Sequence, residues 1–434
     1  MAWGMGSLLL ARAARAEVST FGRRRKAPAR AGRGLRGARC WGTSGGLTRK
    51  PRPAVYPSLR RARLAVSAMF FLNGILFGAW AVRVPAFVET FALDHGALGR
   101  LLLCLALGAI LSFPLAGRLS DRIGADRASR AIGVYYALCL PLIALAPTTG
   151  WLALALLLFG AGHGAMDVAM NGWAAEVERK VMRPIMSAFH AMWSLGAGIG
   201  ALSGGGAVAL GLGPLTHFGL VALVFGALTL GLAMVPWGSQ RSAAKGPGFA
   251  LPSRSLMVVG FVAFCSSLGE GAMADWSAVF LTQIAQTDEA SAALGYTVYS
   301  AAMFAARLTA GHAIARLGPV TTARIAGLFA FAGLVVALVG QTLATGLVGF
   351  ALLGLGYSVV IPLAFTRAAN DRDTPQGRAI AGVATLGYGG MVLGPAVIGG
   401  IGHAFSLPVA FWLIALLALG ITAFAASLRP DGGK

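Results

Sequence analysis

The sequence predicts an all-α integral membrane protein, with twelve transmembrane helices in two six-helix bundles related by a pseudo-two-fold axis. Three observations support this expectation. The 434-residue chain is 57% hydrophobic and only 12% charged, whereas a soluble domain carries about 25% charged residues. Its apolar segments reach about 20 residues, the length that crosses a hydrocarbon core. Short glycine patterns also recur between the two halves of the chain at a fixed distance.

Hydropathy places six spans in each half of the chain. The first six lie near 64–84, 97–117, 129–147, 151–175, 185–208 and 215–236, and the second six near 255–282, 292–312, 322–342, 346–367, 379–402 and 409–428. Glycine and alanine within these spans suit close helix contacts in lipid. We therefore divide the chain into a tail at 1–60, a first bundle at 61–236, a linker at 237–254 and a second bundle at 255–429.

Much of the positive charge, +21 overall, gathers in the tail. Between Met1 and Arg63 there are sixteen lysines and arginines against one acid, Glu17. The tail has no apolar run long enough to cross a membrane or to serve as a secretory signal. Because this charge lies outside the membrane body, we expect no nucleic-acid partner. We expect either a disordered cytoplasmic tail or sequence upstream of the true start, for which Val55 is a candidate.

The charges of the loops predict the orientation in the membrane. Basic residues follow the second and fourth spans, occur in the linker, and recur around Arg316 and from Arg367 to Arg378. The alternate loops, such as PTTG and GQTLATG, carry none. Cytoplasmic loops carry an excess of lysine and arginine. With an even number of spans, both termini are therefore expected in the cytoplasm, and the protein in a bacterial inner membrane.

Two sequence matches at one offset indicate an internal duplication. Gly117–Gly124 reads GRLSDRIG, and Gly311–Gly318 reads GHAIARLG, 194 positions later. Gly160–Gly162 returns as Gly354–Gly356 at the same offset. Repeats of this kind build transporters that rock about a site near the membrane midplane.

The stretch GRLSDRIGADR resembles the loop between the second and third spans of the Major Facilitator Superfamily, through Gly117, Asp121, Arg122, Gly124 and Arg127. We expect Gly117 to let two helices approach, Gly124 to permit a tight turn and Asp121 to cap a helix or pair with an arginine. The resemblance implies that this loop is a cytoplasmic latch. Arg307, Gly311 and Arg316 of the second copy are assigned to the same latch, although Ala315 replaces the aspartate there.

Four further segments resemble the YbjJ-like, sugar-permease-like branch of that superfamily. They are WAVRVPAF (80–87), MDVAMNGWAAEVER (166–179), FHAMWSLGAG (189–198) and GEGAMADW (269–276). The resemblance covers about residues 64–428. It implies the fold and a secondary transport function, and it favours a sugar-like solute.

One polar stripe interrupts the apolar span at 151–175. His163, Asp167 and Asn171 follow one another at intervals of four residues, so they share one face of a helix. A carboxyl group in a membrane is costly and points into a bundle or a watery cavity. Asp167 is therefore a candidate for carrying a proton, with His163 tuning or sharing it. Packing between helices is the alternative explanation of all three.

Glu270 is the second candidate for proton coupling. It lies mid-span between Gly269 and Gly271, and this pair of glycines predicts a local break of the kind from which transporters build sites. Asp275 lies one to two turns further out. It is either a residue of the solute cavity or a solvated acid near the outer interface.

The remaining candidates for the solute cavity are polar or aromatic side chains inside spans: Asn73, Arg83, Asn171, His190, Trp193, Tyr357 and Tyr388. Arg83 precedes Pro85, which is expected to end the first helix, and snorkelling to the interface is its alternative role. Asn73 could bind a hydroxylated ligand or join helices. Trp193 could stack on a sugar ring, and Tyr357 occupies the repeat position of His163.

Nothing in the sequence indicates an enzyme. It has no HExxH motif, no nucleophile elbow, no His/Cys cluster with metal spacing and no GxxxxGK[ST] motif. We therefore expect no metal and no cofactor besides the proton gradient, and a monomer in the lipid bilayer that binds a small solute. Proton-coupled symport of a polar, sugar-like compound is favoured. A proton-linked exporter of drugs or metabolites, and a membrane sensor descended from a transporter, are the alternatives.

Overall fold

The computed structural model describes residues 59–182, 185–239 and 252–429. All of these residues belong to one unit of the chain, and their secondary structure is helical, with no strand among them. The expected tail up to residue 58, the possible start at Val55 and the middle of the linker lie outside the described residues.

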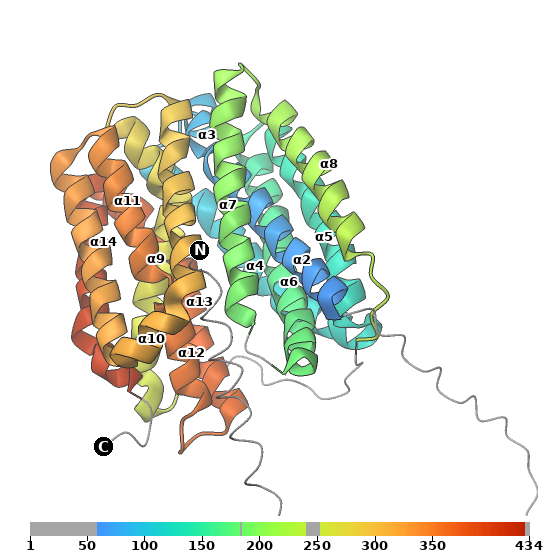
Figure 1. The fold of residues 1–434 in the computed structure, drawn as a ribbon. Coiled ribbons are helices and arrows are strands. Elements are labelled where there is room, and N and C mark those ends of the chain that lie inside the picture. The colour runs from blue at the N-terminus through green and yellow to red at the C-terminus, as the bar shows by residue number, and fades with distance from the viewer. Residues whose placement is uncertain (1–58, 183–184, 240–251, 430–434) are drawn as a thin grey trace, which may run out of the picture. The chain divides into compact units, whose positions relative to one another are not determined.

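Seven helices make up the first half of the described chain (Figure 1). They are α2 (Leu59–Ala81), α3 (Val84–Thr90), α4 (His95–Ile123), α5 (Ala125–Ala144), α6 (Thr149–Val181), α7 (Met186–Ala209) and α8 (Pro214–Ala233). Pro85 lies in the first turn of α3, where a proline costs little because that turn has no use for its missing N–H. The expectation that Pro85 ends the first helix is therefore corrected: α2 stops at Ala81, and Pro85 helps to start α3.

The second half holds η1 (Arg254–Leu256), α9 (Met257–Gln283), α10 (Glu289–Gly340), α11 (Leu343–Tyr357), α12 (Val360–Ala369), α13 (Gln376–Ala404), α14 (Leu407–Phe424) and η2 (Ala425–Leu428). α10 contains two spans, because its backbone leaves the helical region at Gly318 and continues from Pro319 as a second helix. The predicted tenth span is divided into α11 and α12 at Ser358 and Val359.

The described helices account for the twelve spans that the sequence predicts. Nine of them are long and apolar enough to cross a membrane. α10 supplies two spans, and α5 and α7, with 20 and 24 residues, also have the length of a span. Large apolar side chains such as Leu111, Leu138 and Leu223 lie on the outside, 63–70% exposed. Lipid tails are as apolar as leucine, so these side chains lose nothing by facing a bilayer.

Two glycines with left-handed backbone angles make equivalent turns in the two halves. Gly124 joins α4 to α5 with φ 95°, and Gly318 turns α10 with φ 76°. They are 194 residues apart, the offset of the sequence repeat. Glycine adopts such angles at no steric cost because it lacks a Cβ atom. The structure thus places the turn where the sequence predicts it and repeats it in the second half.

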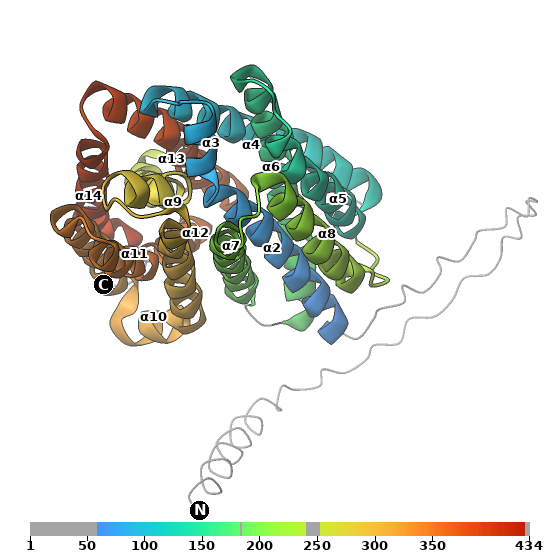
Figure 2. The same cartoon turned by 90° about the horizontal axis from the view of Figure 1, so that it is seen from above.

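The two halves form two bundles that lie beside each other (Figure 2). Seen from above, α7 faces α10 and α4 faces α13, and these two pairs make most of the contact between the bundles. We call the end of the molecule that holds α3 the α3 end, and the opposite end the α12 end (Figure 1).

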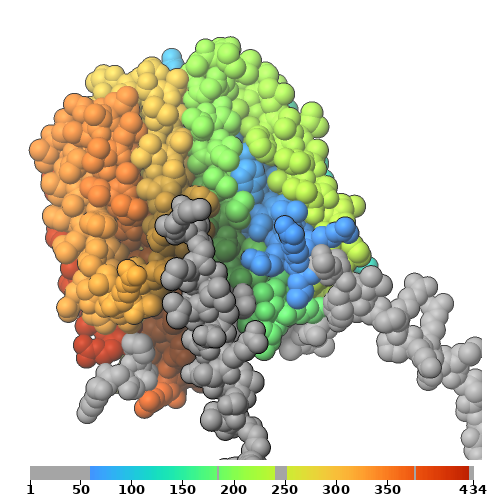
Figure 3. Space-filling view, viewed as in Figure 1, coloured from blue at the N-terminus to red at the C-terminus, as the bar shows by residue number. Residues whose placement is uncertain are grey.

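Backbone meets backbone where the bundles touch at the α3 end. A Cβ atom added to Gly99 of α4 would lie 2.7 Å from the carbonyl oxygen of Pro395 and 3.0 Å from Cα of Gly399, both in α13. A Cβ atom added to Gly205 of α7 would lie 3.0 Å from the carbonyl oxygen of Ala290 in α10. Glycines allow this close approach of helices. The space-filling view shows α7 and α10 in contact along this end (Figure 3).

Three glycines farther from the α3 end have no such neighbours. Outside their own helices, no described atom lies within 4 Å of the position that a Cβ atom would take on Gly117, Gly311 or Gly389. The prediction that Gly117 lets two helices approach is therefore wrong for this conformation. The close backbone contacts between the bundles at Gly99 and Gly205 thus lie at the α3 end.

Candidate functional site

Asp167 lies near the middle of α6, and both oxygens of its carboxylate accept hydrogen bonds. Asn171, one turn further along, donates from Nδ2 to Oδ1 over 3.0 Å. The hydroxyl of Tyr388 in α13 donates to Oδ2 over 3.2 Å. All three side chains keep part of their surface accessible. Because α6 belongs to the first bundle and α13 to the second, the bond from Tyr388 crosses between the bundles.

Tyr388 is positioned for this bond by the contact between α4 and α13. Its ring lies against that of Phe113 in α4, with the ring centroids 5.0 Å apart. The α4–α13 pair is one of the two through which the bundles meet. A movement of α13 relative to the first bundle would therefore carry the hydroxyl of Tyr388 away from Asp167.

Glu270 lies at the middle of α9 and pairs with Arg307 of α10. Nη2 of Arg307 is 3.5 Å from Oε2 of Glu270, and the two side chains are 10% and 19% exposed, respectively. The hydroxyl of Ser266, one turn before Glu270, donates to Oε1 over 3.1 Å. A carboxylate with a cation and a hydroxyl donor as partners can stay ionised inside a membrane protein, where an unpaired charge would be costly.

Arg307 also reaches the first bundle. Its Nη1 donates to the hydroxyl of Ser194 over 2.6 Å and to the carbonyl oxygen of His190 over 3.3 Å, both in α7. Its own carbonyl oxygen accepts a hydrogen bond from Ser187 of α7 over 3.1 Å. The assignment of Arg307 to the latch stays a prediction, and these contacts place Arg307 between the two bundles. Its guanidinium joins the carboxylate of Glu270 in the second bundle to α7 in the first.

The helix break predicted at Gly269 and Gly271 does not occur. α9 continues through both glycines from Met257 to Gln283. Gly269 instead leaves room for Tyr357 of α11, whose ring occupies the space that a Cβ atom would need. Tyr357 is fully buried, and its hydroxyl finds no hydrogen-bond partner among the described residues. The glycine therefore serves packing between α9 and α11.

Asn73, Trp193 and His163 form a chain of hydrogen bonds inside the first bundle. Nε1 of Trp193 donates to Oδ1 of Asn73 over 2.8 Å. Nδ2 of Asn73 donates to the carbonyl oxygen of His163 over 3.2 Å. Asn73 is 0% exposed, so its amide joins α2, α6 and α7 and orients Trp193. Trp193 itself, like His190, keeps part of its surface accessible.

The imidazole of His163 is connected to α5. Its Nδ1 lies 3.2 Å from the hydroxyl of Tyr136, and its ring centroid is 4.7 Å from that of Phe77. His163 and Asp167 thus share a helix face, as predicted, but they belong to separate groups of hydrogen bonds.

The acidic and basic candidates nearer the α3 end are buried. Arg83 is 3% exposed; its Nε lies 3.4 Å from Oε1 of Glu289 at the start of α10, and its Nη2 donates to the carbonyl oxygen of Leu212 over 3.2 Å. This ion pair joins the two bundles, so Arg83 does not snorkel to the interface. Asp275 is 8% exposed in α9, which corrects its alternative reading as a solvated acid.

Apart from Gly124, the latch residues lie in helices rather than in a loop. α4 continues to Ile123, so Asp121 and Arg122 are in its last turn, where both are exposed. Arg127 and Arg316 are exposed as well. Asp121 therefore does not cap a helix N-terminus. The acid that is engaged here is Asp126 in the first turn of α5, 2% exposed, with Oδ2 2.7 Å from Nη2 of Arg130.

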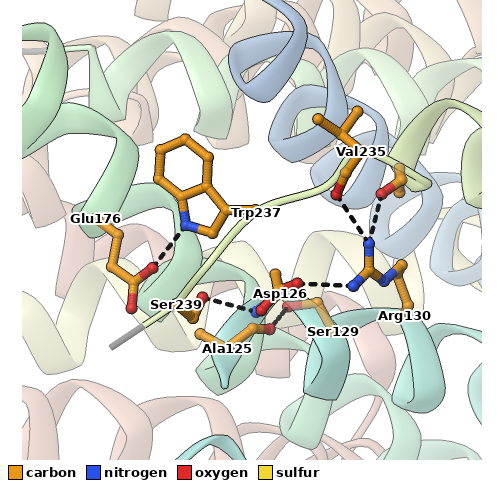
Figure 4. A network of polar contacts seen from close by, with 9 residues as sticks. Ala125, Asp126, Ser129, Arg130, Glu176, Val235, Trp237 and Ser239 are labelled. Atoms are coloured by element: carbon orange, nitrogen blue, oxygen red, sulfur yellow. Dashed lines mark hydrogen bonds and ion pairs between the residues drawn. The ribbon is translucent and has the colours of Figure 1, made fainter. Parts of the chain in front are cut away.

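Asp126 and Arg130 belong to a polar network that fixes the segment after α8 to the first bundle (Figure 4). Arg130 donates from Nη1 to the carbonyl oxygens of Ala233 and Val235, over 3.1 and 3.2 Å. The hydroxyl of Ser239 accepts from the backbone N–H of Asp126 over 3.2 Å, and Trp237 donates from Nε1 to Glu176 of α6 over 2.8 Å. Residues 234–239 are thus held on α5 and α6.

The residues that sequence reasoning missed are partners of those that it found. Ser266 lies four residues before Glu270, and Ser194 lies four residues after His190. This spacing of one helical turn is a signal in the sequence that indicates a contact. Asp126 likewise lies one turn from its partner Arg130 in the same helix, whereas Tyr136 and Glu289 gave no comparable signal, because their partners lie far away in the sequence. Among the described residues, no three His, Cys, Asp or Glu side chains are placed to hold a metal ion.

Comparison with known proteins gives one consistent result. The family model of the Major Facilitator Superfamily matches residues 4–201, 64–253 and 256–433. An uncharacterised transporter of Sinorhizobium fredii, y4wD, is 45% identical over 366 residues, 84% of this chain and 97% of that protein. An uncharacterised MFS-type transporter of Yersinia pestis is 35% identical over 375 residues, 86% and 97% of the two chains. The membrane protein MosC of Rhizobium meliloti is 33% identical over 391 residues, 86% and 91%.

Solved structures of transporters share the fold. The nucleoside transporter NupG superposes with a TM-score of 0.65 at 14% identity, over 85% of this chain and all of that one. A bacterial homologue of the human lysosomal transporter Spinster, in an inward-facing and unoccupied conformation, gives a TM-score of 0.60 at 17% identity, over 86% and 95% of the two chains. At this level of identity the likeness concerns the fold.

Proposed function

This chain belongs to the Major Facilitator Superfamily and is a multi-pass membrane transporter rather than an enzyme, and on that premise we propose that it couples the movement of a small polar solute to the flow of protons. The solute binds between the bundles, where Asp167, Trp193 and Glu270 keep accessible surface. A sugar-like compound suits the mixture of hydroxyl, amide, charged and aromatic groups there. Symport is the favoured direction of coupling.

The observation that carries the proposal is the placement of the two acids. Asp167 in the first bundle is bonded by Tyr388 of the second, and Glu270 in the second bundle is paired with Arg307, which is bonded to Ser194 of the first. Ionisable groups within a membrane protein usually mark substrate or proton pathways. A proton that neutralises either acid weakens a contact between the bundles, which is what coupling requires.

Closure at the α3 end supports alternating access. With the basic loops facing the cytoplasm, as their charges predict, the α12 end is cytoplasmic and both termini lie on that side. The close glycine contacts between the bundles at Gly99 and Gly205 then lie on the outer side. Rocking of the two bundles about the polar groups between them would expose the same site to the other face.

Transport in proteoliposomes tests this function. A thermal-shift screen against sugars, nucleosides, organic acids and cationic dyes first identifies a solute. Solute-dependent proton uptake is then followed with a trapped pH dye in wild type, Asp167→Asn, Glu270→Gln and the double variant. Asp373→Asn is the matched control, because Asp373 is an exposed acid near α12.

We expect the proton flux to be lost in at least one single variant and in the double variant, while solute still binds to at least one of them. Proton flux at the wild-type rate in the double variant would refute the coupling. Flux out of vesicles loaded with a cationic dye, with none for polar solutes, would identify an exporter. Solute binding without any flux in the wild type would identify a sensor.

A further inference from the structure

Two histidines bridge the bundles at the α3 end. His95, the first residue of α4, lies 2.8 Å from Oε1 of Gln283 in α9 through its Nε2 and 3.1 Å from the carbonyl oxygen of Gly402 in α13 through its Nδ1. His403 of α13 approaches Asp94, the N-cap of α4, with Nδ1 3.6 Å from Oδ2. Each of these contacts joins one bundle to the other. We call His95, His403 and their three partners the histidine seam.

Both ring nitrogens of His95 face oxygen atoms. A neutral imidazole has one nitrogen that donates and one that accepts, whereas the imidazolium donates from both. The carbonyl oxygen of Gly402 can only accept, so a neutral ring donates there and keeps its second contact only if Gln283 turns its NH₂ group toward it. The imidazolium satisfies both oxygens as they stand. Hydrogen bonds from a charged donor are also roughly twice as strong as neutral ones.

The contact between His403 and Asp94 is also stronger when the histidine is protonated. The backbone N–H of Ala97 donates to Oδ1 of Asp94 over 2.6 Å. This hydrogen bond lowers the pKa of Asp94, with help from the nearby charges of His403 and Arg100 and against a smaller opposite effect of burial. Asp94 is therefore a carboxylate throughout the range in which histidine titrates. His403 forms an ion pair with it only when the imidazole is protonated.

The other charged groups around the seam do not cancel this dependence. Arg100 lies on the α4 side, close to Gly96 and Asp94. On the side of α3 and α10, Glu89 and Glu289 line a cavity of about 310 Å³ together with Gln283, and Arg83 pairs with Glu289. α9 presents Gln283 and the ring of Trp276, 6.2 Å from that of His95. The three carboxylates near the seam belong to Asp94, Glu89 and Glu289, and the two arginines are Arg83 and Arg100. The net charge of these groups is therefore negative, so protonation of the histidines is not opposed.

We propose that protonation of His95 and His403 strengthens the contact between the bundles at the α3 end, so that acid on that side favours the conformation that is closed there. This switch is independent of the acids between the bundles. It acts through the ends of three helices, α4, α9 and α13, and these ends carry no part of the proposed solute site. If the proposed proton coupling failed, the seam would still respond to pH.

The distance between two spin labels across the α3 end tests the proposal. The native cysteines are replaced by alanine, and labels are placed at Thr149→Cys in the first bundle and Ala344→Cys in the second, both exposed at the starts of helices. Pulsed electron resonance in nanodiscs then gives the populations of short and long distances without any solute. We expect the ratio of closed to open molecules to fall about tenfold from about pH 5 to about pH 8.

Substitution of the histidines identifies the sensor. The double variant His95→Gln, His403→Gln keeps polar side chains but cannot titrate, and its distance distribution is expected not to change with pH. His312→Gln is the matched control, because His312 is exposed in α10 and lies outside the seam. A wild-type distribution that does not respond to pH overturns the proposal. So does a pH response that persists in the double variant.

Discussion

The hydroxyl of Tyr388 donates a hydrogen bond to Oδ2 of Asp167 over 3.2 Å, from the second bundle to the first. The other oxygen of the same carboxylate accepts from Asn171, one turn along its own helix. The charge of Asp167 is thus stabilised partly by its own bundle and partly by the opposite one. Any conformation that separates α13 from the first bundle leaves this carboxylate with one donor fewer.

Replacing Tyr388 by phenylalanine isolates this bond. The ring stays against Phe113, so the thermal stability should change little. A hydrogen bond to a charged group contributes about 1.5–3 kcal/mol, and we expect solute-dependent proton flux in proteoliposomes to fall by about tenfold. Tyr135→Phe is the control, because the Tyr135 hydroxyl donates to the carbonyl oxygen of Leu158 on the exposed surface of the first bundle. Equal flux in Tyr388→Phe and wild type would contradict the role of this bond.

Two glycines of α4 should respond differently to the same change. A side chain at Gly99 collides with the backbone of α13, whereas one at Gly117 meets no described neighbour outside its helix. Gly99→Val is therefore expected to lengthen the distance between labels at 149 and 344, and Gly117→Val is expected to leave it unchanged. If both variants showed the wild-type distance, the close contact between Gly99 and α13 would not be needed for closure of the α3 end.

The hydrogen bonds that join Trp193 to Asn73 and Asn73 to His163 predict a coupling energy between Trp193 and Asn73. Asn73→Leu leaves the indole N–H of Trp193 without its partner and removes a second donor from the carbonyl oxygen of His163, at a cost of about 2 kcal/mol. In a Trp193→Phe background the indole donor is already gone, and the cost of Asn73→Leu should be smaller by about 1 kcal/mol. Unfolding of the four proteins of this cycle measures the difference. Additive losses would show that Asn73 does not act through Trp193.

The network of Figure 4 predicts how much the indole nitrogen of Trp237 contributes to the stability of the protein. Trp237→Phe keeps an aromatic ring beneath Lys180, whose Nζ lies 4.1 Å from the indole centroid, and removes the bond to Glu176. We expect a loss of about 1 kcal/mol of stability, seen as a lower midpoint of thermal unfolding. Trp151→Phe, at a tryptophan that is 59% exposed, should leave the midpoint unchanged. A larger loss at Trp151 than at Trp237 would argue against the network.

The sequence located the spans and the acids because both signals are local. A run of about 20 apolar residues can be recognised from the local sequence alone, and a single acid such as Asp167 or Glu270 is conspicuous within it. The partners are different. Tyr388 lies 221 residues from Asp167, and Arg307 lies 37 residues from Glu270, so their meeting depends on how helices and bundles pack.

Glycine gave the least reliable signal, since one residue type serves three purposes. Gly124 makes a turn with φ 95°, Gly99 brings two backbones together, and Gly269 makes space for Tyr357. The spacing of glycines in the sequence cannot separate these roles. The sequence therefore predicts the turn at Gly124 correctly, but it also predicts a break at Gly269 and a close approach at Gly117 that the structure does not have.

The single-residue turns at Gly124 and Gly318 have a mechanical consequence. Each joins two membrane-length helices through one residue, so a displacement of one helix at this end also displaces the start of the next. We expect the two bundles to move relative to each other as rigid bodies. This movement takes place where α7 meets α10 and α4 meets α13, and small side chains at these surfaces permit it.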